Sequence, residues 1–346
     1  MTTLTPQALF TDPAWQGFAL IDVRSPGEYE EACLPGALNL PLFSNEERAR
    51  VGTLYKKKSP DAALLEGLDI AGGKMRKLVE TARKVAPGNK IVVHCWRGGQ
   101  RSGSVAWLLE RAGFEVGQLI GGYKAARKYI REYVGEAHHP FKVLSGPTGS
   151  GKTPILLAMQ ALGANVVDLE GLANHKGSAF GGLGEAPQPC SEAFENRLFA
   201  ALLAFPEGEA VWLEDESRMI GHVYLSDEFY GRLVASPIVV LVQPVEWRIK
   251  HLVENYARYP KADLSAAFTR IQKRLGGQHL KAALEALAED DFAAAARIAL
   301  VYYDKAYSHY GDRRDGEVLY KVEAASPEVV EIARQVLEEG RFVPEA

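Results

Sequence analysis

The sequence predicts an α/β protein of two consecutive domains, each built around a parallel β-sheet. The chain has 346 residues, which is enough for two domains that each bury a hydrophobic core. Short apolar runs alternate along it with stretches of helical periodicity, the pattern of parallel sheets with crossover helices. Two of these runs, at 91–93 and 141–145, lead directly into a glycine-rich loop and a helical pattern. A break at Gly135–Pro140 lies between them, so we expect one domain over residues 1–135 and a second over 136–346.

The composition is that of an ordinary soluble protein, with 47% hydrophobic and 24% charged residues. No apolar run approaches the length of a membrane span and the N-terminus lacks a signal-peptide pattern, so we expect a cytoplasmic protein without a membrane partner. Cys33, Cys95 and Cys190 are odd in number and widely spaced, which argues against a disulfide framework or a zinc site. The net charge of −4 leaves a nucleic-acid partner open, because a local basic face is sufficient for binding.

The N-terminal domain begins with a strand at 18–24 that ends in polar residues, followed by a helix start at 25–29. A turn with a short strand follows at 34–41, and two charge-rich helices are expected at 45–58 and 73–85. Strands that alternate with helices form a parallel sheet, whose ligands bind beyond the carboxyl ends of the strands.

Cys95 lies at such a carboxyl end, directly after the buried strand at 91–93. A glycine-rich arc follows it and leads into a helix at about 102–111. A short strand at 118–120 and a helix to about residue 133 complete the domain.

The chemistry of this loop favours a reactive sulfur. Backbone N–H groups and the positive end of a helix dipole both stabilise a thiolate over a thiol. Arg97 and Arg101 act in the same direction, so Cys95, Arg97 and Arg101 are the candidate catalytic residues. The alternative is a buried, unreactive cysteine that only ends a strand. An unreactive buried thiol is normally surrounded by apolar side chains, whereas glycines and arginines follow Cys95.

Residues 1 to about 135 resemble a rhodanese domain. The matching segments are Ile21–Arg24, Glu28–Tyr29, Leu34–Asn39, His94–Ser102 and Gly121–Tyr123. In that family the loop cysteine carries a sulfur atom as a persulfide held by loop amides, a role that the resemblance gives to Cys95. It also makes Asp22 and Arg24 a structural pair of the first strand. Trp96 departs from the small or charged residue that follows the cysteine in many rhodaneses, and either a base-stacking surface or a lid over the loop would account for it.

The second domain opens with a strand at 141–145, the loop Gly146–Thr153 and a helix at 154–162. The loop has the spacing G-x-x-x-x-G-K-T, in which successive backbone N–H groups cradle a phosphate chain. Lysine adds a positive charge at the terminal phosphates, and the threonine hydroxyl can take a Mg²⁺ ligand position. The residues expected to contact the phosphates are Gly146, Gly149, Ser150, Gly151, Lys152 and Thr153.

Two further segments are candidates for the same site. An apolar strand at 210–213 ends in acidic residues, and Asp215 or Glu214 is the candidate for holding Mg²⁺ through water. Between this strand and the phosphate loop, the segment 168–182 is rich in glycine and polar residues, which is typical of a second anion- or substrate-binding loop. Its candidate ligand contacts are His175, Lys176 and Ser178. A mobile glycine-rich loop is the alternative.

The rest of the chain is expected to be mostly helical. A buried strand at 238–242 precedes a helical region at about 245–300. The tail forms a helix capped by Ser326 that runs to Glu339–Gly340.

The helical region is locally basic. Residues 246–285 contain eight lysines and arginines against four acidic residues. Arg270 and Arg274 are expected to share one helix face. Their neighbours in this interpretation are Lys273, Lys281, Tyr256, Tyr259 and Phe268. An RNA-contacting face and an ordinary solvated face are both compatible with this pattern.

The whole chain resembles the bacterial tRNA 2-selenouridine synthase family. The resemblance rests on His94–Gly99, the phosphate loop directly after the rhodanese unit, His175–Ser178 within 168–182, and Glu214–Arg218 with Ile220–Gly221. Trp96 fits this family. The resemblance implies replacement of sulfur by selenium in the wobble 2-thiouridine of a tRNA anticodon loop, with selenophosphate as the donor. It also implies S-geranylation by geranyl diphosphate, which makes the sulfur a better leaving group.

The resemblance makes Cys95 the site of selenium delivery and the phosphate loop, with a Mg²⁺ near Thr153 and Asp215, the site of the geranyl donor. An enzyme that produces selenophosphate is then an expected partner. Two other hypotheses stay open at this point. One is a rhodanese-type sulfurtransferase fused to an ATP- or GTP-hydrolysing domain, and the other is an RNA-binding module with an inactive rhodanese domain.

Overall fold

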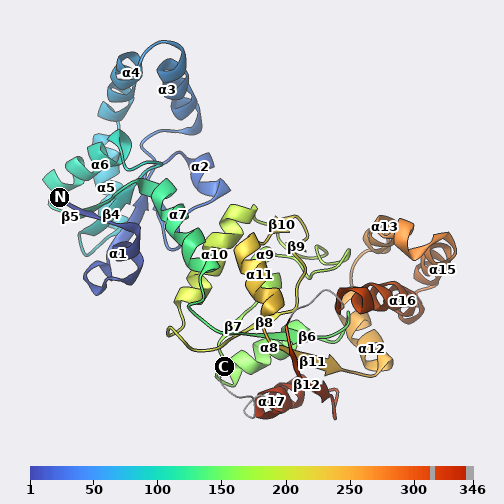
Figure 1. Ribbon diagram of the computed structural model, residues 1–346. Coiled ribbons are helices and arrows are strands. Elements are labelled where there is room, and N and C mark those ends of the chain that lie inside the picture. Colours follow the sequence, from blue (N-terminus) through green and yellow to red (C-terminus); the bar gives the residue numbers. More distant parts are fainter. Residues whose placement is uncertain (312–315, 340–346) are drawn as a thin grey trace. The chain divides into compact units, whose positions relative to one another are not determined.

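The computed structural model describes residues 1–311 and 316–339, and the chain forms two compact units (Figure 1). One unit consists of residues 1–133 with Glu195–Arg197, and the other of the remaining residues. Each contains a five-stranded parallel sheet. The α/β class predicted from the sequence is therefore confirmed, with a rhodanese-like first unit and a P-loop second unit that carries additional helices. Within the described ranges, no helix is long and apolar enough to cross a membrane.

The sheet of the first unit has the strand order β1-β5-β4-β2-β3, and all of its pairs are parallel. The strands are β1 (Thr2–Leu4), β2 (Ala19–Asp22), β3 (Leu38–Asn39), β4 (Lys90–His94) and β5 (Glu115–Leu119). Strand β4 is central and is buried from Ile91 to His94, as its continuous apolar sequence predicts. Strand β1 is not predicted by the sequence pattern, because three residues are too few to show a period.

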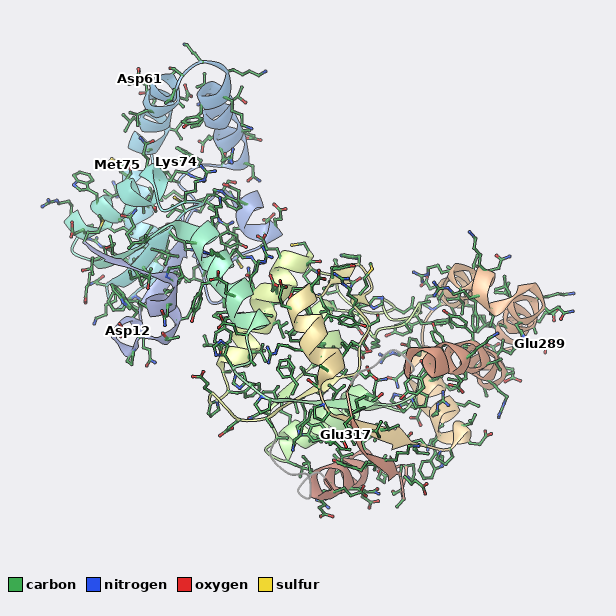
Figure 2. All side chains as sticks on the ribbon, in the orientation of Figure 1. Asp12, Asp61, Lys74, Met75, Glu289 and Glu317 are labelled. Atoms are coloured by element: carbon green, nitrogen blue, oxygen red, sulfur yellow. The ribbon has the colours of Figure 1, made fainter. Side chains whose placement is uncertain are left out.

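Helices cover this sheet and also extend from it. They are α1 (Pro6–Thr11), the 3₁₀ turn η1 (Pro13–Trp15), α2 (Pro26–Glu31), α3 (Asn45–Lys57), α4 (Pro60–Gly72), α5 (Met75–Val85), α6 (Gln100–Arg111) and α7 (Gly122–Gly135). Helix α4 is an addition to the predicted elements, although Ser59 caps it by accepting a hydrogen bond from the Ala62 amide at 3.0 Å. Lys74 directly precedes α5 (Figure 2) and forms an ion pair with Glu47 of α3.

The second unit has the strand order β12-β11-β6-β8-β7, again with all pairs parallel. Its strands are β6 (Phe141–Ser145), β7 (Val166–Val167), β8 (Val211–Glu214), β11 (Ile238–Val242) and β12 (Val318–Glu323). Helices α8 (Lys152–Ala161) and α17 (Val329–Glu339) share one hydrophobic core with these strands. Ser326 accepts a hydrogen bond from the Glu328 amide but is not the predicted helix cap, because α17 begins only at Val329. Gly340 lies outside the described residues. Outside the helical region, the second unit also contains α9 (Leu169–Ala173), α10 (Ser191–Leu203), α11 (Asp227–Ala235) and the hairpin of β9 (Met219–Ile220) and β10 (Val223–Tyr224).

The helical region forms a second hydrophobic core of its own. Its helices are α12 (Val245–Tyr256), α13 (Lys261–Arg270), α14 (Gln272–Leu275), α15 (Gly277–Ala288) and α16 (Phe292–Gly311) (Figure 1).

This bundle corrects the predicted basic face. Arg270 ends α13 whereas Arg274 belongs to α14, so the two arginines do not share one helix. Phe268 is buried in the bundle core, and Tyr256 packs against that core. The charged side chains of Arg270, Lys273, Arg274 and Lys281 are exposed. Of the aromatic residues expected between them, Phe268 and Tyr256 therefore belong to the bundle core. Whether the exposed basic side chains contact RNA stays a prediction.

Candidate functional site

The Cys95 loop connects β4 to α6 and holds the sulfur of Cys95 in a polar setting. Cys95 is buried, and its Sγ lies 3.2 Å from Oγ of Ser102 in the first turns of α6. Ser102 Oγ also accepts a hydrogen bond from Gln118 Nε2 at 3.2 Å, which fixes the hydroxyl beside the sulfur. Burial raises the pKa of the Cys95 thiol, but Ser102, the charge of Arg101 and the Arg97 amide outweigh burial, so the pKa is lowered. The loop therefore favours the thiolate, as its sequence predicts.

The shape of this loop depends on two glycines in the left-handed region. Gly98 has φ +66°, and a Cβ atom there would lie 2.6 Å from the carbonyl oxygen of Leu119. Gly122 has φ +58°, and a Cβ atom there would lie 2.3 Å from the carbonyl oxygen of Cys95. That carbonyl also accepts a hydrogen bond from the Tyr123 amide at 2.8 Å. The start of α7 therefore presses directly against the loop and leaves no room for side chains at either position.

The two predicted arginines have different surroundings. Arg97 is exposed. Arg101 is partly buried, and its Nη1 donates a hydrogen bond to Glu28 Oε2 at 2.9 Å. Burial raises the pKa of Glu28, but Arg101, the Ser25 amide and Arg48 outweigh it, so the Glu28 pKa is lowered and the pair stays ionic. Cys95, Arg97 and Arg101 thus lie around one loop, with Arg101 held in place by a carboxylate.

Trp96 covers one side of the loop. Its ring stacks on Tyr123 with ring centroids 5.6 Å apart and an interplanar angle of 27°. Tyr123 is fully buried, and the guanidinium of Arg24 lies 3.8 Å from the centre of its ring. Arg24 in turn forms a buried ion pair with Asp22, which makes these two residues structural. Trp96 is 40% exposed, so an aromatic surface supported by Tyr123 is open to solvent at the residue that follows Cys95.

The phosphate loop of the second unit connects β6 to α8. Gly149 and Gly151 have φ +82° and +70°, the left-handed conformation that turns consecutive N–H groups into one concavity. Lys152 Nζ donates a hydrogen bond to the Gly146 carbonyl at 3.1 Å. Ser150 Oγ is buried and has no hydrogen-bond partner among the described residues. The loop therefore has the backbone geometry of a phosphate-binding site, and the Ser150 hydroxyl is available to bind a phosphate oxygen.

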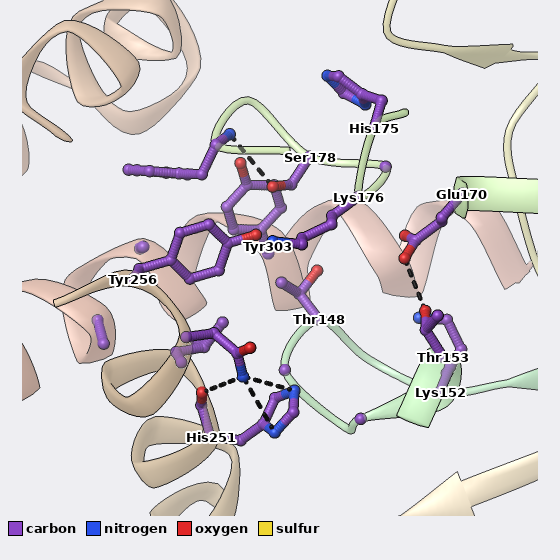
Figure 3. Close-up of a pocket in the computed structure, with 18 of the residues that line it drawn as sticks. Thr148, Lys152, Thr153, Glu170, His175, Lys176, Ser178, His251, Tyr256 and Tyr303 are labelled. Carbon is purple, nitrogen blue, oxygen red and sulfur yellow. Dashed lines mark hydrogen bonds between the residues drawn. The ribbon is translucent and has the colours of Figure 1, made fainter. Parts of the chain in front are cut away.

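Acidic residues stand beside this loop. Thr153 Oγ1 donates a hydrogen bond to Glu170 Oε2 at 2.7 Å (Figure 3). Asp215 lines the same cavity and accepts a hydrogen bond from Ser145 Oγ. Glu214 is fully buried behind it and accepts from the Leu169 amide at 2.9 Å, and burial raises its pKa well above the ordinary value. Of the two predicted acids, Asp215 faces the cavity.

The segment after α9 brings His175, Lys176 and Ser178 to the cavity, as predicted (Figure 3). Lys176 Nζ pairs with Glu185 at 2.8 Å and lies 5.7 Å from the centre of the Tyr256 ring. Ser178 Oγ accepts a hydrogen bond from the Phe180 amide at 3.2 Å. Burial and the charges of His222 and Arg270 lower the pKa of His175, so its imidazole is neutral at pH 7.

The cavity has two chemically different parts and a volume of about 790 Å³. One part is lined by the phosphate loop, the acidic residues and the segment around His175. The other extends into the helical bundle and is lined by Phe180, Leu264, Phe268, Leu287, Phe292, Ala295, Ala296 and Ala299. Volumes of this order bind drug-sized ligands. The arrangement suits a ligand with a phosphorylated head and an apolar tail.

Several site residues have no signal in the sequence. Arg248 is buried and reaches the phosphate loop from α12, where its Nε donates to the Thr148 carbonyl at 2.9 Å. Tyr303 reaches the cavity from α16, and its hydroxyl accepts a hydrogen bond from the Ala179 amide at 3.1 Å. Burial raises the pKa of Tyr303 to about 12, so the phenol stays neutral. Glu170 and Glu216 also line the cavity. Glu170 belongs to the predicted segment 168–182, and Glu216 follows the predicted Asp215 directly in the chain.

Comparison with known proteins covers both units. Residues 139–339 match the family model of the tRNA 2-selenouridine synthase AAA domain, and residues 7–128 match that of the rhodanese-like domain. The chain is 33% identical to the tRNA 2-selenouridine synthase of Shewanella sediminis (strain HAW-EB3), over 92% of this chain and 94% of that protein. It is 35% identical to the tRNA 2-selenouridine synthase of Marinobacter nauticus, over 90% of this chain and 92% of that protein. The protein of the same name from Bdellovibrio bacteriovorus is 40% identical over 70% of this chain and 65% of its own length.

Proposed function

The chain belongs to the tRNA 2-selenouridine synthase family, and we propose that it replaces sulfur by selenium in the wobble 2-thiouridine of tRNA in two steps. The second unit first transfers a geranyl group from geranyl diphosphate to the sulfur. Selenium from selenophosphate, delivered at the Cys95 loop, then replaces the geranylated sulfur. The observation that carries the two-step route is the cavity in which a phosphate loop opens into an apolar chamber.

The phosphate loop would hold the diphosphate head of the donor. The amides of Gly149 and Gly151, together with Lys152, would bind its oxygens and stabilise the diphosphate as it leaves. The apolar chamber would take the geranyl chain out of water, which favours binding through the hydrophobic effect. A nucleotide would place its base and ribose in the same chamber, and the chamber offers them mainly hydrocarbon walls.

Mg²⁺ is compatible with the residues around the loop. No group of three or more His, Cys, Asp and Glu side chains is arranged as a metal site in the part of the chain that the structure describes. A Mg²⁺ that shares a diphosphate and water needs only one or two carboxylates. Thr153 and Asp215 would hold it, with Glu170 next to the Thr153 hydroxyl. The ion would supply positive charge to the departing diphosphate.

Geranyl transfer would proceed by substitution at the allylic carbon. The sulfur on C2 of the thiouracil forms a bond to the first carbon of the geranyl chain, the carbon–oxygen bond to diphosphate breaks, and N3 of the base loses a proton. His175 lines the cavity and is neutral at pH 7, so it is the residue that we assign as the proton acceptor.

Selenium transfer would take place at the Cys95 loop. A dianionic selenium donor suits a loop flanked by Arg97 and Arg101. The charge of Arg101 and the backbone amide of Arg97 also lower the thiol pKa. Selenium forms a bond to C2, and the bond from C2 to the geranylated sulfur breaks, which releases geranylthiolate. Water then cleaves the selenium–phosphorus bond and releases phosphate. Selenophosphate needs a dedicated producing enzyme, which we propose as a partner alongside the tRNA substrate.

The experiment is nucleoside mass spectrometry of tRNA from a strain that lacks the gene and carries variants of it. Wild type should restore 2-selenouridine. Cys95→Ser should accumulate the geranylated thiouridine, and Lys152→Ala should accumulate 2-thiouridine. The matched controls Cys190→Ser, at an exposed cysteine, and Lys142→Ala, on β6 away from the cavity, should both behave as wild type.

Two outcomes would contradict the proposal. Selenouridine formed by the Cys95→Ser variant would remove Cys95 from selenium transfer. Normal geranylation by the Lys152→Ala variant would show that the phosphate loop has another ligand. Calorimetry decides between the hypotheses for that ligand, because tight ATP or GTP binding with turnover and no binding of geranyl diphosphate would favour a sulfurtransferase fused to a nucleotide hydrolase.

A further inference from the structure

One face of α16 lines the cavity along most of its length. Tyr307, Tyr303, Ala299 and Ala295 follow one another at intervals of four residues, and all four line the cavity. Residues at this spacing lie on the same side of a helix. Tyr307 is at the phosphate-loop end, since its hydroxyl lies 2.9 Å from Oγ of Ser145, the last residue of β6.

The side chains on this face become small with distance from the phosphate loop. At a rise of 1.5 Å per residue, Ala299 lies about 12 Å and Ala295 about 18 Å along the helix from Tyr307. The phenols of Tyr303 and Tyr307 line the cavity nearer the phosphate loop, and the methyl groups of Ala295, Ala296 and Ala299 line it farther along the helix. The α16 side chains that line the cavity are therefore smallest where it extends into the helical bundle.

The other side chains that line this part of the cavity are large and well packed. Leu264 and Phe268 come from α13 and Leu287 from α15, and all three are buried. Phe180 packs edge-on against Phe268 with ring centroids 5.0 Å apart. These side chains hold one another in place. The depth of the chamber is therefore set by the face of α16 that carries Ala295 and Ala299, called the alanine face below.

We propose that Ala299 and Ala295 set the length of the prenyl chain that the cavity accepts. The inference rests on the proposed function, since it takes the diphosphate of the donor to be anchored at the phosphate loop. A fixed head makes the chain end reach a definite place along α16, so that a larger side chain at Ala299 blocks shorter chains than one at Ala295. The ligand class is an allylic prenyl diphosphate, and the alanine face determines how many isoprene units it carries.

The test measures binding to the full-length protein by calorimetry. The four ligands are inorganic diphosphate, dimethylallyl diphosphate, geranyl diphosphate and farnesyl diphosphate. Ala299→Leu should weaken geranyl diphosphate about tenfold or more, because the distal methylene groups lose their apolar contacts, and leave inorganic and dimethylallyl diphosphate within about twofold of wild type. Ala295→Leu should weaken farnesyl diphosphate more than geranyl diphosphate. Ala293→Leu, an exposed position of α16 outside the cavity, is the matched control and should change none of them.

The outcomes separate this inference from the proposed function. If wild type binds inorganic diphosphate but gains no affinity from any prenyl chain, both the geranyl step and the alanine face are overturned. If wild type prefers geranyl diphosphate and the two alanine variants keep its order of preference, the chain-length inference alone is wrong. Unchanged binding of inorganic diphosphate reports that a variant is folded, and Ala296→Leu, at a partly exposed position of the same face, replaces any variant that fails this check.

Discussion

Arg248 and Asp304 form an ion pair that ties α12 to α16 beside the phosphate loop. Arg248 Nη1 donates to Asp304 Oδ2 at 3.1 Å, and the Arg248 Nε donates to the Thr148 carbonyl at 2.9 Å. The buried guanidinium of Arg248 thus bonds both to the phosphate loop, which would hold the diphosphate, and to α16, which would limit the length of the prenyl chain. The two parts of the cavity are therefore mechanically connected.

Arg248→Met should weaken diphosphate binding and lower stability. It removes the bond to Thr148 and leaves Asp304 without its partner, which we expect to cost about 2 kcal/mol of unfolding free energy, because Asp304 is partly exposed and water replaces part of the loss. Calorimetry with inorganic diphosphate and urea unfolding measure the two effects. Asp304→Asn should keep the Thr148 bond and most of the binding. Equal loss of diphosphate affinity in both variants would show that the bond to Thr148 is unimportant.

Ser102→Ala should raise the pKa of Cys95. The Ser102 hydroxyl is the nearest polar group to the sulfur, and its hydrogen bond stabilises the thiolate against the effect of burial. The rate of iodoacetamide alkylation against pH, followed at Cys95 by peptide mass spectrometry, reports this pKa. Cys33 in the same samples is the internal control, because burial raises its pKa and its profile should lie at higher pH. A Cys95 profile that Ser102→Ala leaves in place would assign the lowered pKa to the charge of Arg101 and the backbone amides of Arg97 and Ser102.

Stability should fall as the pH decreases from about 6.5 to about 4 because of His94. Burial lowers the pKa of His94 to about 4, and the charge of Asp22 opposes this only in part. The unfolded chain takes up a proton near pH 6.5 and the folded chain does not, so acid favours the unfolded state, by about 3 kcal/mol between pH 7 and pH 4.

Urea unfolding of wild type and His94→Asn at several pH values gives the unfolding free energy of each as a function of pH. The contribution of His94 is the difference between the slopes of the two curves. His279→Asn, at an exposed position of α15, should follow wild type. Parallel pH profiles for wild type and His94→Asn would mean that His94 is protonated in the folded protein.

Trp96→Ala should raise the KM of selenium transfer for geranylated tRNA about tenfold, the size expected for the loss of one base–aromatic stacking contact. Trp96→Phe keeps an aromatic ring on Tyr123 and should keep most of the affinity. Trp107→Ala, at an exposed indole of α6, is the control. If Trp96→Ala instead leaves KM unchanged and speeds alkylation of Cys95, the indole is a lid over the loop.

Local sequence patterns predicted the two strand–loop–helix units well, for a physical reason. The Cys95 loop and the phosphate loop are each contiguous, so the residue types that shape them are adjacent in the chain. The two parallel sheets follow from the alternation of strands and helices. The chemical roles of Cys95, Arg97, Arg101 and the phosphate-loop residues stay predictions, because geometry places them without testing them.

Residues that reach a site from a distant helix could not be found in this way. Arg248 and Tyr303 are separated from the phosphate loop by about a hundred residues or more, and nothing beside them in the chain indicates the contact. The helix face predicted to carry both Arg270 and Arg274 was wrong for a related reason. Helix α13 ends at Arg270 and α14 begins at Gln272, so no single helical period runs through Arg270 and Arg274.

The close approach of Gly98 and Gly122 has a consequence for engineering this chemistry. The position of the sulfur is set by a backbone contact between two segments, one around Cys95 and one at the start of α7, that are far apart in the chain. A transplant of residues 95–102 into another scaffold would carry the cysteine and the arginines but lose the surface that shapes them. The smallest portable unit is therefore a pair of segments, and the second contains no reactive residue at all.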